Sequence, residues 1–194
     1  MLQMIALSIF NICMSNEIDI HTVWIPRIEN QRADFISRII DIDDWGTTVD
    51  FFQLLDSLWG PHTVDRFANM NNTKLLRLNS LYWNPGSIAV DAFTSDSSGE
   101  NNWLVPPVSM VSRVINHLIK SNSVGTSVVP KCPSSSFWLL LFHTGLIYKK
   151  HVTDVLEFSE IDRILQPGNN VNSLFARGDV TGNILAVRLD ASVY

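Results

Sequence analysis

Polar residues and prolines stand where three predicted strands end, and these are the positions at which the chain could do chemistry. Asp65 ends one short apolar run, Asp91 ends another, and Val105 is followed by a double proline, Pro106-Pro107. In open α/β sheets, ligands bind beyond the carboxyl ends of parallel strands, where loops supply polar groups. The two carboxylates are therefore candidate ligand contacts. The alternative is that each acid merely ends its strand and caps the turn that follows.

Other catalytic chemistries find no matching pattern in the sequence. The five histidines form no pair four residues apart and have no cysteine at ligand spacing, so we expect no zinc site. The serines at 134–136 lack a nucleophile elbow, and the glycines form neither a dinucleotide-binding nor a phosphate-binding loop. Cys13 and Cys132 lie far apart, which fits a reducing compartment. We therefore expect an intracellular protein, located in the cytoplasm, the nucleus or both.

The composition predicts a folded domain with no strong affinity of its own for nucleic acid. Hydrophobic residues make up 46% of the 194 residues and charged residues 17%, which suits a packed core. The net charge of −5 argues against autonomous phosphate binding and leaves weak or partner-assisted contact open. Six tryptophans lie in apolar or strand-like contexts, so we expect them in the core rather than in base-stacking platforms: Trp24, Trp45, Trp59, Trp83, Trp103 and Trp138.

The apolar stretch at residues 2–14 predicts a buried helix. It lacks the basic start and the small-residue cleavage site of a signal peptide. It is also too short to span a bilayer, so we expect no membrane partner. A β-rich run at 20–25, stopped by Pro26, and a helix at 30–40 follow it.

The acidic stretch at 41–44 is interpreted as a linker, because adjacent acids on a loop seldom converge on a metal. The expected organisation is therefore a fragment at 1–40, the linker, and a main domain at 45–194. Strands alternate with helices along the main domain, which predicts an open, mainly parallel α/β sheet with helices on both faces.

The first helix of the main domain has a clear amphipathic pattern. Thr47 or Thr48 can cap it, and it extends through Leu58. Its expected apolar side consists of Phe51, Phe52, Leu54, Leu55 and Leu58. The other expected elements are strands at 62–65, 87–93, 102–105, 126–130 and 183–190, and helices at 109–120 and 134–141.

The run WIPRIENQRADFISR at 24–38 resembles the last strand and helix of retroelement RNase H domains. The matching residues are Trp24, Ile25, Pro26, Asn30, Ala33, Asp34, Ser37 and Arg38. The resemblance implies that Asp34 corresponds to the last metal-binding carboxylate of that family. Two-metal hydrolysis needs several converging carboxylates, and the family's other acids lie upstream of this motif. We therefore expect no RNase H activity from a lone Asp34, and Mg²⁺ binding only if the upstream carboxylates are supplied.

A second resemblance covers most of residues 43–141. The landmarks are DDW (43–45), WGPHTVDRFA (59–68), NS (79–80), VDAF (90–93), GENNWLVPP (99–107) and FWLLL (137–141). Their order resembles the region after RNase H in DIRS-type and related tyrosine-recombinase retroelements. The same order is also similar to phage-type adenine-N6 DNA methyltransferases. The resemblance implies a Rossmann-like, methyltransferase-like fold, in which Asp65 lies near the amino-acid or ribose portion of S-adenosylmethionine and Asp91 near its adenosine.

The double proline decides which activity the resemblance implies. In active adenine methyltransferases an Asn or Asp precedes Pro-Pro and accepts a hydrogen bond from the target amino group, while a following aromatic ring stacks on the flipped base. Val105 and Val108 occupy these positions here and can play neither role. Asn101 and Asn102 could substitute only after a register shift. The degenerate motif, Val105-Pro106-Pro107, thus predicts a retained fold without methyl transfer and without a required cofactor.

The function expected from these resemblances is a non-catalytic fragment of a retrotransposon reverse transcriptase/RNase H polyprotein. It would be a structural or docking module between the upstream reverse transcriptase–RNase H and the downstream recombinase of the same element. Contact with nucleic acid would be weak or indirect. The enzyme alternative is an adenine-N6 DNA methyltransferase that uses S-adenosylmethionine with a degenerate motif, and a third alternative is a decayed copy that folds poorly.

Overall fold

The computed structural model describes residues 2–26, 28–29, 45–84, 86–143, 147–168 and 182–192. Two compact units make up the chain, Met1–Ile40 and Asp41–Tyr194. None of the helices among the described residues is long and apolar enough to cross a membrane.

The first unit contains the helix α1 (Leu2–Ser15), where a helix was predicted. Its large apolar side chains, Phe10 among them, are exposed, so the expectation of a buried helix is wrong. The predicted strand at 20–25 is also wrong: these residues are irregular, because a strand needs a hydrogen-bonded neighbour and none of the described residues pairs with them. The predicted helix at 30–40, with Asp34, and the linker at 41–44 lie outside the described residues.

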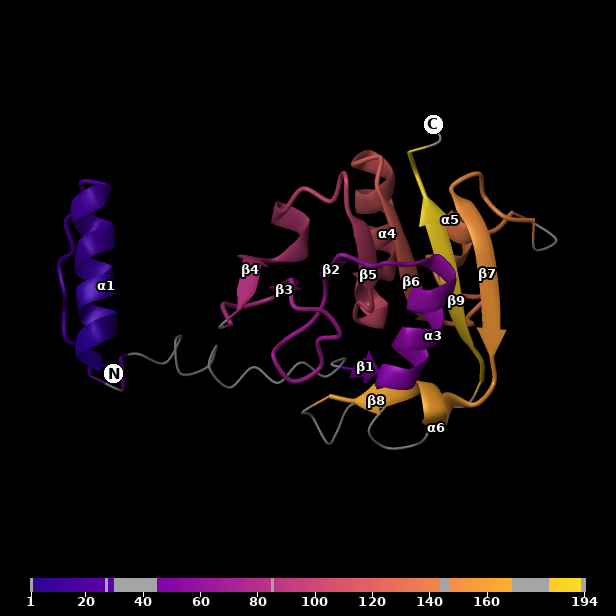
Figure 1. Ribbon diagram of the computed structural model, residues 1–194, viewed down its shortest axis with the longest axis horizontal. Coiled ribbons are helices and arrows are strands. Elements are labelled where there is room, and N and C mark those ends of the chain that lie inside the picture. The colour runs from indigo at the N-terminus through magenta and orange to yellow at the C-terminus, as the bar shows by residue number, and fades with distance from the viewer. Residues whose placement is uncertain are drawn as a thin grey trace. The chain divides into compact units, whose positions relative to one another are not determined.

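The second unit is built on a seven-stranded sheet in the order β4-β3-β2-β5-β6-β9-β7 (Figure 1). The strands are β2 (Val64–Asp65), β3 (Leu78–Ser80), β4 (Ser87–Val90), β5 (Asn101–Leu104), β6 (Val124–Pro130), β7 (Val152–Phe158) and β9 (Ile184–Asp190). Neighbouring strands from β4 to β6 pair in parallel. β9 pairs antiparallel with both β6 and β7. The predicted open, mainly parallel α/β sheet is therefore confirmed.

Helices cover both faces of this sheet, as predicted. The apolar side of α3 (Val49–Trp59) packs in one core cluster, and those of α4 (Val111–Lys120) and α5 (Trp138–Leu141) pack in another. Successive residues of a strand point to opposite faces. Val128 and Val129 of β6 belong to different clusters, so the two clusters lie on opposite faces of the sheet.

The sequence explains the start of α3. The side chain of Thr48 accepts a hydrogen bond from the backbone N–H of Phe51 at 3.4 Å, which satisfies one of the free donors at the helix start. Phe51, Phe52 and Leu55 are buried against the sheet, as predicted. The expected apolar side is too wide, because Leu54 and Leu58 are exposed.

A small second sheet places the start of the main domain beside the carboxyl end of β5 in the large sheet. β1 (Trp45–Thr47) pairs antiparallel with β8 (Leu165–Pro167), which follows the short helix α6 (Ile161–Ile164). The indole N–H of Trp45 donates to the carbonyl of Pro106 at 3.1 Å. β1 therefore lies beside the turn that follows β5.

The six tryptophans divide between core and surface. Trp45, Trp103 and Trp138 are buried, which confirms the core prediction for them, and Trp59 is partly buried. Trp24 and Trp83 are 84% and 75% exposed, so the prediction is wrong for these two.

Candidate functional site

The strand order reverses at β2, because β3 and β4 lie on one side of it and β5 and β6 on the other. In an open α/β sheet, the carboxyl ends of the strands at such a reversal border the usual ligand crevice. A pocket of about 190 Å³, counting the open space at its mouth, lies there. Its lining consists of Trp45, Gly46, Thr47, Asp65, Phe67, Ala68, Asn72, Trp103 and Val105.

This pocket joins two of the predicted site residues. Asp65 and Val105 line it together, from the ends of β2 and β5. Asp91, Pro106 and Pro107 do not belong to its lining. Trp45 and Thr47 were not predicted as site residues, and they reach the pocket through the pairing of β1 with β8.

Asp65 is a buried acid, with 2% of its surface exposed. Its Oδ2 atom accepts a hydrogen bond from the backbone N–H of Lys74 at 3.0 Å. Burial raises the pKa of this carboxyl group from 3.8 to about 6, and the hydrogen bond and the charge of Lys74 oppose that rise. Asp65 can therefore change its charge near neutral pH, inside the pocket.

Thr47 places a hydroxyl group in the same pocket. Its residue is 1% exposed, and its Oγ1 atom has no hydrogen-bond partner among the described residues. Leaving a buried hydroxyl group unpaired costs free energy, so such groups are usually satisfied by protein, by water or by a ligand. The pocket therefore contains two buried polar groups, the carboxyl group of Asp65 and the hydroxyl group of Thr47.

The turn after β5 offers no catalytic acceptor. Val105 is buried in the core cluster that contains α3, and its side chain cannot form a hydrogen bond. The carbonyl of Pro106 already accepts the Trp45 indole N–H. Val108, which begins the 3₁₀ helix η2 (Val108–Met110), packs against the opposite core cluster. The turn therefore lacks both the polar acceptor and the aromatic surface that base methylation needs.

Asn101 lies at the start of β5, at the opposite end of this strand from the double proline. Its side-chain amide donates to the carbonyls of Trp59 and Pro61, each at 2.9 Å. Its Oδ1 atom accepts from Arg188 at 2.6 Å. Asn101 therefore cannot replace the missing acceptor, and the register shift considered from the sequence does not occur.

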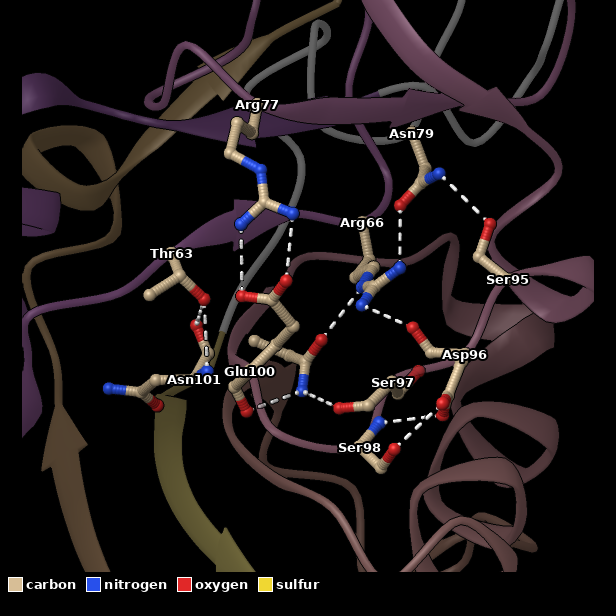
Figure 2. Close-up of polar contacts among 11 residues, drawn as sticks. Thr63, Arg66, Arg77, Asn79, Ser95, Asp96, Ser97, Ser98, Glu100 and Asn101 are labelled. Carbon is tan, nitrogen blue, oxygen red and sulfur yellow. Dashed lines mark hydrogen bonds and ion pairs between the residues drawn. The ribbon is translucent and has the colours of Figure 1, made fainter.

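Asn102 is fully committed to a buried polar network centred on Arg66 (Figure 2). The Arg66 guanidinium donates from Nε to Asn102 Oδ1 at 2.7 Å, from Nη1 to Asn79 Oδ1 at 2.9 Å and from Nη2 to the Asp96 carbonyl at 2.9 Å. Arg66 is only 4% exposed, and burial lowers the pKa of its guanidinium. All three of these acceptors are neutral oxygens.

The network extends from Arg66 into the loop before β5. The Asn102 amide donates to the carbonyls of Ser97, Glu100 and Val124. An ion pair between Arg77 and Glu100, at 2.7 Å, lies at its exposed side (Figure 2). The network thus ties β2, β3 and β5 to the loop at 95–100.

Three sequence landmarks meet in this network: VDRFA provides Arg66, NS provides Asn79, and GENNW provides Asn102. Their convergence was not predicted from the sequence. The available signal was a polar residue beside a short apolar run in each landmark. The contacts assign these landmark residues to holding the sheet together.

Asp91 follows β4 and acts as a turn cap. Its Oδ1 atom accepts from the backbone N–H of Phe93 at 3.0 Å, at the start of the 3₁₀ helix η1 (Ala92–Thr94). Its own N–H donates to the carbonyl of Ser80 at 2.8 Å. Its φ of 59° lies in a region that few non-glycine residues adopt. The structure thus gives Asp91 the turn-capping role that was the alternative to adenosine contact.

A second hollow, of about 260 Å³ counting the open space at its mouth, lies between η1 and α4. Arg66, Phe93 and His117 contribute to its lining. The Nε2 atom of His117 is buried without a hydrogen-bond partner among the described residues, and its ring contacts Phe93 edge to face. This hollow is mainly apolar and opens on the α4 face of the sheet.

The residues at the carboxyl ends of the central strands do not fit a whole S-adenosylmethionine molecule. Small-molecule sites usually enclose about 300–1,000 Å³, whereas the cavity volume of each hollow is about 10 Å³, which is room for about one water molecule. Asp65 and Thr47 could contact one polar end of such a molecule, but Asp91 is engaged in its turn. Within the described ranges, no three His, Cys, Asp or Glu side chains gather to hold a metal ion.

The chain matches none of the known protein-family models, and no curated protein is similar to it at a significant level.

Proposed function

We propose that this chain is a non-catalytic module of a retrotransposon reverse transcriptase/RNase H polyprotein. Its methyltransferase-like domain would serve as a structural or docking element near nucleic acid. Its partners would be the upstream reverse transcriptase–RNase H and the downstream recombinase of the same element, inside the cell, in the cytoplasm, the nucleus or both. The sequence landmarks support the retroelement part of this proposal.

The strand order supports the methyltransferase-like part. The sheet starts at β2, grows outward to β4 on one side and to β6 on the other, and ends with β9 reversed between β6 and β7. A reversed strand inserted before the edge strand is the arrangement of Rossmann-like methyltransferases. Likeness of fold does not assign an activity, because activity depends on the residues of the site.

The turn after β5 carries the non-catalytic part of the proposal. Transfer of a methyl group to a flipped adenine needs a hydrogen-bond acceptor for the amino group and a flat surface for the base. Val105 provides no acceptor, and Trp45 already donates to the carbonyl of Pro106. Val108 packs into the core rather than facing a base. A turn made of these residues can stabilise the fold without catalysing methyl transfer.

The direct test is a methylation assay on the full chain. Duplex DNA is incubated with the protein and S-adenosylmethionine, and N6-methyladenine is measured by mass spectrometry. We expect none above the level of a protein-free control. Val105→Asn restores an acceptor without the aromatic surface, so this variant should be equally inactive. Detection of N6-methyladenine with the unmodified chain would overturn the proposal.

The enzyme alternative has one observation in its favour, the polar pair formed by Thr47 and Asp65 at the ligand edge. If the domain is a methyltransferase with a degenerate motif, this pair should bind the amino-acid end of S-adenosylmethionine. Isothermal titration calorimetry then shows saturable binding, and Thr47→Val, which keeps the shape and removes the hydroxyl group, weakens it. The non-catalytic proposal expects no saturable heat with either protein.

A further inference from the structure

The imidazole ring of His62 lies between α3 and the sheet, at the amino ends of the parallel strands. The connection from α3 to β2 places it there, and its side chain is fully buried. The rings of Phe52 and Trp103 flank it, with centroids 6.0 Å and 5.2 Å from its own. Both of these rings belong to the core cluster that contains α3. An ionisable group therefore lies inside the apolar contact between this helix and the sheet.

Side chains from two different elements hold the ring of His62. Its Nδ1 atom lies 2.7 Å from Oδ1 of Asp56 on α3, and its Nε2 atom lies 2.8 Å from the hydroxyl oxygen of Thr126 on β6. The same Asp56 oxygen accepts from the backbone N–H of His62 at 2.8 Å. Arg188 on β9 donates from Nη1 to the Thr126 hydroxyl oxygen at 3.5 Å. This relay of hydrogen bonds, from Arg188 through Thr126 and His62 to Asp56, ties α3 to β6 and β9.

The two ends of the relay fix the direction of its hydrogen bonds. A guanidinium can only donate, and an ionised carboxylate can only accept. The Nδ1 atom of His62 therefore carries the proton and donates to Asp56. Its Nε2 atom accepts from the Thr126 hydroxyl group, whose oxygen accepts from Arg188. Every bond of the relay is made only while His62 is neutral.

A second proton on the ring, at Nε2, breaks this order. Nε2–H and Arg188 would then both donate to Thr126, and the Thr126 hydroxyl hydrogen would have no acceptor among the described residues. Thr126 is fully buried, so water does not replace the lost acceptor. Burial lowers the pKa of His62 and outweighs the opposing effect of the Asp56 carboxylate. The closed arrangement therefore resists the second proton.

The charged groups around His62 come from two elements. Asp56 on α3 stabilises an imidazolium, and Arg188 on β9 opposes one. β6 faces the ring with the neutral Thr126, and β5 faces it with an indole ring. β7 contributes Asp154, which accepts from another indole N–H at 3.3 Å and not from His62. The response of His62 to pH is therefore set by its burial, by one carboxylate and by one guanidinium.

We propose that His62 is an acid-sensitive latch that holds α3 on the sheet. At neutral pH the neutral ring completes the relay and keeps α3 closed over its core cluster. A second proton is accommodated only when the ring leaves its position and reaches water. That movement carries the connection at 60–63 and the adjoining end of α3 away from β6. Acid therefore opens this end of α3, while the opposite core cluster stays packed.

Hydrogen exchange of the full chain, followed by mass spectrometry, tests the latch. Rates are measured at about pH 7.5 and about pH 5.5 and corrected for the intrinsic effect of pH. A histidine with the ordinary pKa of 6.5 in the open state and a lower pKa in the closed state favours opening by up to about tenfold across this range. Peptides from α3 should therefore exchange up to about tenfold faster at the lower pH. Peptides from α4, on the opposite face, should change much less.

Two variants separate the latch from a general effect of acid. His62→Gln stays neutral at both pH values, and its amide can donate to Asp56 and accept from Thr126, so exchange in α3 should no longer respond to acid. The matched control is His151→Gln, which removes the other buried histidine whose pKa burial lowers, and α3 should keep its response. Asp65 also titrates in this range, but it is present in both variants and its protonation stabilises the fold.

A measurement on the unmodified chain keeps the test independent of whether His62→Gln folds. The NMR signal of the His62 ring, assigned through its contact with the Trp103 ring, should titrate together with the acceleration of exchange in α3. The latch is refuted if the two curves do not coincide, or if exchange in α3 does not respond to acid. Equal acceleration in α3 and α4, or an acid response that persists in a folded His62→Gln, would also overturn it.

Discussion

The two halves of the large sheet are held together in different ways. From β5 to β7, most strands are seven residues long, and the buried side chains form two apolar clusters with α3, α4 and α5. From β2 to β4, the strands have two to four residues, and none contributes a buried member to either cluster. The second half depends instead on Arg66 and its neutral acceptors.

The difference shows what each kind of stabilisation can do. Apolar packing is not directional, so many different apolar side chains can fill the core between long strands and helices. Hydrogen bonds to a buried cation fix positions closely, and they fail together when one member is lost. The polar half of the sheet, from β2 to β4, therefore keeps its short strands in register, but its stability is sensitive to single substitutions.

The largest expected effect is that of Arg66→Met. The substitution leaves two buried acceptors, on Asn79 and Asn102, without their donor, and it also removes the donor to the carbonyl of the exposed Asp96. Each unsatisfied buried group costs about 1–3 kcal/mol, so we expect the free energy of unfolding to fall by about 4 kcal/mol in urea titrations. Hydrogen exchange should accelerate at the amides of β2 and β3 more than at those of β6 and β9.

The matched control for this variant is Arg77→Met. Arg77 lies in the same half of the sheet, and its side chain is half-exposed, so loss of its ion pair with Glu100 should change stability much less than loss of Arg66. If Arg66→Met is as stable as the unmodified chain, the polar half does not depend on its buried cation.

The next effect concerns Asp65→Asn and depends on pH. The carboxyl group has a pKa of about 6 in the folded chain and an ordinary value of 3.8, so the folded state holds this proton more tightly. Asp65 therefore weakens the fold as pH rises from about 4 through about 6, and the loss at pH 7 is about 3 kcal/mol. Asp65→Asn should raise the free energy of unfolding at pH 7 by up to that amount.

The two proteins should become equally stable below about pH 3, where Asp65 is protonated in both the folded and the unfolded state. Burial lowers the pKa of His62 and His151, so stability also falls as pH drops below 6.5. Both histidines are present in each protein, and the difference between the two stability curves isolates Asp65. A pH-independent difference would contradict the raised pKa.

The smallest expected effect is that of Thr47→Val. The hydroxyl group of Thr47 is buried without a partner among the described residues, and valine has nearly the same shape. Removing an unsatisfied polar group should raise the free energy of unfolding by about 1 kcal/mol in urea titrations. A loss of stability would mean that water or a ligand satisfies this hydroxyl group.

The apolar half of the sheet could be predicted from the sequence better than the polar half. Val111, Val114, Ile115 and Leu118 recur at helical spacing and are buried on α4, as the pattern predicts. β3 escaped prediction because its three residues, Leu78–Ser80, are mostly polar and show no alternation. Such a strand is defined by its neighbours, which the local sequence does not reveal.

The candidate site was predictable only in part. Asp65 and Val105 follow adjacent parallel strands, so their meeting at one edge follows from the sheet itself. Thr47 and Trp45 reach that edge because β1 pairs with β8, more than a hundred residues away along the chain. The exposure of Trp83 could not be predicted either, because an apolar run has the same sequence pattern whether or not a helix covers it.

The position of β9 between β6 and β7 sets an order of events during protein synthesis. In the part of the chain that the structure describes, β9 is the only strand that pairs with β7, and β9 is made after it. While the ribosome is still translating residues 159–183, β7 cannot dock and β6 has a free edge, which invites pairing with other nascent chains. A chain truncated before residue 184 would therefore lack β9 and could not complete its sheet.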